Sequence, residues 1–133
     1  MEKTTVGVWF KLVGYDFDVN YVTQELDTQP TYTCNKDDLL RSGKKCGCTA
    51  WEIGIEPEES NDFEAQVNKV LGLFFDKVEL LNKISRETKA SWRVTTVVYV
   101  GDDGSPAIGF SKEQLKFFGE IGAEFVEIDL YCC

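Results

Sequence analysis

The sequence has no histidine among its 133 residues. Histidine is the commonest general acid–base, and Ser–His and Cys–His pairs depend on it. No G-x-S-x-G, G-x-G-x-x-G or H-E-x-x-H motif occurs either. The nearby carboxylates have simpler explanations, because Asp16 and Asp18 suit a turn and a helix cap, and Asp102 and Asp103 suit a hairpin turn. We therefore expect a protein that is not an enzyme and needs no cofactor.

Long apolar runs and basic residues are also scarce. No run approaches the ~20 residues of a membrane span. The first strand-like segment, 6–13, does not resemble a secretory signal, because Gly7 and Lys11 interrupt it. Fourteen basic residues face 23 acidic ones, a net charge of -9, which argues against nucleic acid and anionic membranes as partners. We expect a cytoplasmic protein whose charge suits a basic protein partner, although many cytosolic proteins are simply acidic.

The five cysteines allow three interpretations. An odd count and the lack of a signal sequence favour reduced thiols. Cys34, Cys46 and Cys48 could instead bind a metal or take part in redox chemistry. The C-x-C spacing is not the usual one for zinc. A disulfide between the neighbours Cys132 and Cys133 would be strained, because adjacent strand residues point apart.

Hydrophobic periodicity predicts a single α+β domain over 1–133. The longest helical pattern covers 61–84, where Asn61 and Glu64 match a capping box and Gly72 favours a break. Shorter helices are expected after Asp18 and after Ser111, the second with Leu115, Phe118 and Ile121 as its apolar stripe. Strands are predicted at 4–13, 49–55, 90–100 and 124–133, with short ones at 31–34 and 107–110. The alternating strands imply a mainly antiparallel sheet of ferredoxin-like character, with helices on one face.

The outward residues of these strands form the candidate binding surface. Aromatic rings among charged groups are typical of interaction surfaces. In the last strand, Val126, Ile128, Leu130 and Cys132 are expected to face the core. The candidate binding residues are Trp9, Glu52, Arg93, Tyr99, Glu127, Asp129 and Tyr131, with Lys11 and Thr95 between them. An ordinary solvated face, with Arg93 paired to Glu52 or Asp129, explains the same pattern.

A family resemblance runs through nearly the whole chain. It is carried by Phe10-x-Leu12-x-Gly14-Tyr15-Asp16-Phe17-Asp18, Val22-Thr23, Leu26, Pro30-Thr31, Gly43 before Trp51, and Ser111-x-Glu113-x-Leu115…Gly122…Asp129-x-Tyr131-Cys132. These motifs resemble the bacterial domain-of-unknown-function family 4279. The sequence departs from the family's pattern at Val19, where proline is frequent, and in its cysteine-rich loop.

The resemblance implies no assigned activity and no catalytic residues. It does imply a possible role, since some members of the family are suspected immunity proteins. Taken together, we expect a protein-binding module of the bacterial cytoplasm, with neutralisation of a basic toxin as one role. The alternative is a metal- or ligand-binding protein that uses its cysteines. The sequence identifies neither the partner nor the oligomeric state.

Overall fold

The computed structural model describes residues 2–132 and contains one five-stranded sheet with four helices. In chain order the elements are β1 (Thr5–Gly14), α1 (Val19–Leu26), β2 (Tyr32–Cys34), β3 (Thr49–Glu59), α2 (Phe63–Leu71), α3 (Val78–Thr88), β4 (Ser91–Val100), α4 (Lys112–Glu120) and β5 (Phe125–Cys132). The sheet order is β2-β3-β1-β4-β5. All neighbours are antiparallel except β4 and β5, because a parallel pair needs a crossover and α4 provides it. The predicted α+β class is confirmed.

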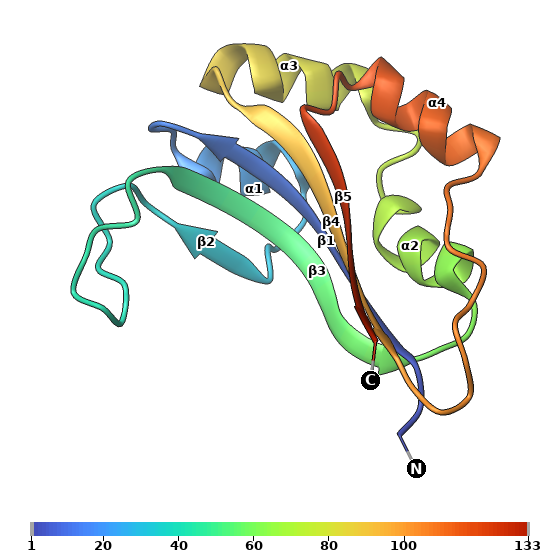
Figure 1. The fold of residues 1–133 in the computed structure, drawn as a ribbon. Helices are drawn as coiled ribbons and strands as arrows, with labels where there is room; N and C mark the ends of the chain where they lie inside the picture. The colour runs from blue at the N-terminus through green and yellow to red at the C-terminus, as the bar shows by residue number, and fades with distance from the viewer. Residues whose placement is uncertain (1, 133) are drawn as a thin grey trace.

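The helices cover one face of the sheet. Figure 1 shows α2, α3 and α4 along one side of the curved strands. α1 lies on the same side, because its Thr23 hydroxyl accepts a hydrogen bond of 3.0 Å from the buried Trp51 indole. The inward residues of β1 are fully buried, as the alternation predicts; they are Val6, Val8, Phe10 and Leu12. The other side of the sheet carries no helix in the described residues, and we call it the open face.

The helical pattern over 61–84 is broken at Gly72, as predicted, and forms two helices. α2 ends at Leu71, and the chain turns through Gly72 before α3 begins at Val78. Phe74 is fully buried from within this turn. The N-cap is Asp62, whose carboxylate accepts from the Ala65 N–H at 3.0 Å, and not the predicted Asn61.

Two further predictions are wrong. Residues 107–110 form no strand, although Ile108 and Phe110 pack against the core. In the predicted stripe of α4, Phe118 and Ile121 are buried as expected, but Leu115 is exposed. The buried residues lie at i, i+3, i+4 and i+7 and are Gln114, Phe117, Phe118 and Ile121. Gln114 can be buried because it completes the capping box with Ser111 and donates to Asn68 Oδ1 at 2.9 Å.

β5 is the largest departure from the predicted burial. Its residues expected to face the core are largely bare: Ile128 is 39% exposed and Leu130 is 51% exposed, and Cys132 is exposed as well. Only Val126 packs against the core. The helices bury β1 and β4 and stop short of this edge strand, so β5 has apolar side chains that nothing in the described chain covers.

Candidate binding surface on the open face

One row of side chains on the open face crosses all five strands. The pairing register places Glu52 opposite Lys11, Lys11 opposite Arg93 and Arg93 opposite Phe125. Tyr32 lies opposite Glu52 on the edge strand β2. The row therefore has one acidic and two basic side chains in the middle and an exposed aromatic ring at each end.

The cations of this row are already paired. Lys11 Nζ lies 3.8 Å from a Glu52 oxygen, and Arg93 Nη2 lies 3.3 Å from a Glu124 oxygen. The Arg93 guanidinium also lies 5.1 Å from the centre of the Phe125 ring. Arg93 thus pairs with neither Glu52 nor Asp129, because Lys11 separates it from Glu52 and Asp129 lies farther along β5. Its buried Nε–H has no acceptor in the described chain, an unsatisfied group of the kind that calls for an explanation.

Glu52 is a half-buried member of this row. Burial raises the pKa of its carboxyl above the usual value, and the neighbouring Glu56 carboxylate adds to the rise. Lys11 acts in the opposite direction but only partly offsets the burial. The Lys11–Glu52 pair therefore compensates a desolvation cost and adds little net stability.

Trp9 lies flat on the open face over two glycines. A Cβ atom at Gly54 would lie 2.3 Å from Trp9 Cδ1, and one at Gly7 would lie 2.6 Å from Cη2. The absence of both side chains lets the indole rest against the sheet, with Pro57 next to the Gly7 position. The result is a broad, partly exposed apolar surface beside the charged row.

The far end of the open face carries a pair of stacked tyrosines. The rings of Tyr99 and Tyr131 are 5.0 Å apart at 16°, and about half of each side chain is exposed. A hollow of about 510 Å³ opens beside them. It is lined by Glu2, Lys3, Thr5, Glu59, Tyr99, Val100, Gly101, Tyr131 and Cys132. Two carboxylates, one lysine and two aromatic rings therefore meet at this hollow.

Glu127 and Asp129 are charged residues of the open face that have no ionic partner in the described chain. Both are exposed on β5, opposite Thr95 and Val97. Neither forms an ion pair within residues 2–132. The surface therefore offers two acidic groups between the Arg93–Phe125 contact and the tyrosine pair.

The DUF4279 family, described as a domain of unknown function, matches residues 2–133, essentially the whole chain. The chain belongs to this family. No curated protein matches the chain. No solved structure matches it either. Among residues 2–132, no helix has the length and apolar character that crossing a membrane requires.

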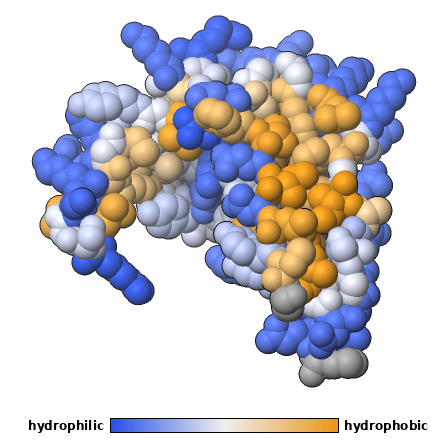
Figure 2. All heavy atoms as spheres, viewed as in Figure 1, coloured by the Kyte–Doolittle hydropathy of each residue, from blue (hydrophilic) through white to orange (hydrophobic). Residues whose placement is uncertain are grey.

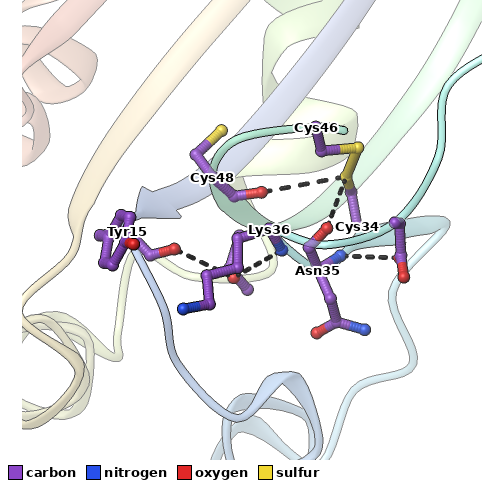
Figure 3. The surroundings of a disulfide bond; sticks show 8 residues. Tyr15, Cys34, Asn35, Lys36, Cys46 and Cys48 are labelled. Atoms are coloured by element: carbon purple, nitrogen blue, oxygen red, sulfur yellow. Dashed lines mark hydrogen bonds between the residues drawn. A yellow bond between two sulfur atoms is a disulfide. The ribbon is translucent and has the colours of Figure 1, made fainter. Parts of the chain in front are cut away.

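The cysteine-rich loop of this DUF4279 domain holds a disulfide. Cys34, at the end of β2, is bonded to Cys46, and Cys34 Sγ lies 4.0 Å from the Cys48 carbonyl oxygen (Figure 3). The prediction of reduced thiols is therefore wrong for Cys34 and Cys46, while Cys48 and Cys132 are free. The odd count required only one thiol to stay unpaired, and the loop from β2 to β3 brings these two together.

The disulfide affects the alternative interpretation, in which the cysteines bind a metal ion. With Cys34 and Cys46 bonded to each other, they supply no thiolate in this state. The described residues contain no group of three or more cysteines or carboxylates arranged to hold a metal ion. The predicted set of Cys34, Cys46 and Cys48 is therefore not assembled as a ligand set.

The remaining carboxylate pair is engaged structurally. Asp18 accepts from the Asn20 N–H at 2.9 Å as the N-cap of α1, and Asp16 lies 3.6 Å from Lys36 Nζ. A shallow hollow beside them also contains Tyr21. The Tyr21 hydroxyl donates to Glu87 at 2.6 Å, and this hydrogen bond, with burial and nearby carboxylates, raises the pKa of Tyr21 to about 12.

All seven predicted binding residues lie on the open face of the domain. Sequence reasoning missed Tyr32 and did not include Phe125 among them. Both end the row that crosses the sheet, and both are aromatic and about half exposed. Strand alternation predicts Phe125 on this face, since it is in phase with Glu127, but the candidate set left it out. The position of Tyr32 on the open face depends on the register of β2, a strand only three residues long.

Proposed function

We propose that this DUF4279 domain is a non-enzymatic protein-binding module whose open face receives a basic partner. The observation that carries this proposal is the pair of unpaired carboxylates, Glu127 and Asp129, on a face that also presents Trp9 and the Tyr99–Tyr131 stack. Aromatic anchors supply contact area at low entropic cost, and opposite charge guides association.

The resemblance to a family with suspected immunity proteins narrows the partner class. A basic toxin, such as a nuclease, is the partner that we propose, because a net charge of -9 would steer it onto the domain. Binding of this kind weakens as salt screens the charges. We also propose the bacterial cytoplasm as the compartment.

Affinity capture with a variant tests the proposed surface. The tagged domain is expressed in its native host beside a variant in which Trp9, Arg93 and Tyr131 are all changed to alanine. We expect the variant to lose its captured partner at least tenfold by quantitative mass spectrometry, because two apolar anchors and one directional cation are removed.

A matched triple variant controls for the chemistry of the change. Tyr15, Arg86 and Leu115 are exposed residues outside the set of candidate binding residues, and changing all three to alanine removes a similar amount of surface. This control is expected to retain the partner. Equal retention by both folded variants would show that the open face is not the binding surface.

A further inference from the structure

β5 is an edge strand that the fold leaves unusually accessible. It pairs only with β4, so the backbone groups on its outer side meet no strand in the described chain. Natural edge strands are usually blunted by short length, proline, lysine or a bulge. The opposite edge follows this rule, since β2 has three residues. β5 has eight residues, no proline or lysine, and a continuous register with β4, and its only charged residues, Glu127 and Asp129, are acidic and lie on the open face.

The side chains of β5 are exposed on both faces of the sheet. Phe125 and Tyr131 are 49% and 53% exposed on the open face, and Ile128 and Leu130 are exposed on the other. Figure 2 shows hydrophobic side chains gathered over β5. Exposed apolar groups beside unpaired backbone are the features that an added strand would bury.

A second copy of the chain fits this edge poorly. The longest antiparallel overlaps of two β5 strands about a two-fold axis are centred on Ile128 or Asp129. Each of these registers places an acidic side chain opposite an acidic one, which is destabilising. The net charge of -9 on each chain adds long-range repulsion.

We infer that β5 accepts an extended segment of the partner as a sixth strand, with basic and apolar residues alternating along it. This inference rests on the proposed function and specifies how the partner is held. On the open face, the basic residues meet Glu127 and Asp129. On the other face, the apolar residues cover Ile128 and Leu130, and main-chain hydrogen bonds join the segment to β5.

A synthetic peptide tests this mode of binding without the partner. The probe is a capped heptapeptide of alternating lysine and valine, with its fully N-methylated analogue as the comparison. The analogue keeps the charge but has no N–H donor for the edge. We expect fluorescence anisotropy to show binding of the first peptide, and at least tenfold weaker binding of the second. No binding of the first peptide, or equal binding of both, would overturn strand addition.

An edge variant provides the second measurement. Changing Ile128 and Leu130 to threonine keeps the strand propensity but removes the two apolar side chains that an added strand would cover. This variant is expected to bind the peptide at least tenfold more weakly. Leu39 and Leu40, exposed in the loop before β3, are changed to threonine as the matched control and should leave binding unchanged. Equal binding by both variants would overturn the inference.

Two further outcomes separate this inference from its alternatives. A dimer in sedimentation velocity that the edge variant dissociates would make a second copy the occupant and overturn the inference. If the captured partner is lost by the Trp9, Arg93 and Tyr131 variant but kept by the edge variant, the proposed function stands and strand addition fails. Loss of the partner in both variants supports the proposed function and strand addition together.

Discussion

Replacing Phe10 by alanine is expected to lower the free energy of unfolding by about 3–5 kcal/mol. Phe10 is fully buried at the middle of β1. Its ring stacks on Trp92 at 4.6 Å and lies 5.0 Å from Phe74, so it joins the sheet to the turn between α2 and α3. The total free energy of unfolding of a domain of this size is about 5–15 kcal/mol. Urea unfolding followed by circular dichroism measures the loss.

Phe125 provides the matched control for this prediction. It undergoes the same change from phenylalanine to alanine but is half exposed on β5, where it contacts Arg93. We expect its removal to cost less than about 1 kcal/mol. Similar losses in the two variants would contradict the burial pattern that defines the covered and open faces.

Replacing Gly101 by alanine is expected to cost about 1–3 kcal/mol, with a matching fall in the urea midpoint. A Cβ atom at Gly101 would lie 2.4 Å from the Glu2 carbonyl oxygen and 2.7 Å from the Thr4 nitrogen. These are backbone atoms that a side-chain rotation cannot move. The start of the chain would have to separate from the end of β4, beside the hollow next to Tyr131.

The same substitution at Gly109 tests whether contact, and not glycine chemistry, is responsible. Nothing lies within 4 Å of a Cβ atom at Gly109, and its φ is not positive. Alanine there is expected to be neutral or to stabilise by about 0.4–1 kcal/mol, because it restricts the unfolded chain. Gly101→Ala as stable as Gly109→Ala would show that the chain start does not pack against β4.

Much of the fold could be predicted because local patterns and tertiary packing agree. The alternation of β1 and β4 matches their buried and exposed faces, and Asp18 and Ser111 cap helices where their spacing suggested. The placement of Trp9, Arg93 and Tyr131 on one face follows from a side-chain period of two. Local chemistry therefore determined which residues share the open face.

The features that could not be predicted from the sequence depend on contacts between distant segments of the chain. Alternation in β5 shows which residues share a face, but not that the helices stop before covering Ile128 and Leu130. The partner of Arg93 depends on the lateral order of the strands, and the Cys34–Cys46 bond depends on the path of a 14-residue loop. No spacing within one segment reports either arrangement.

Hydroxyl-radical footprinting tests the open face most directly. In the isolated domain, Tyr99 and Tyr131 should be labelled much faster than Trp51 and Trp92, which are fully buried. Adding the captured partner should slow the labelling of both tyrosines and leave the two buried tryptophans unchanged. The account would be contradicted if the two tyrosines were as protected as Trp92 in the isolated domain. It would also be contradicted if they were labelled equally with and without the partner, because the open face would then not receive another protein.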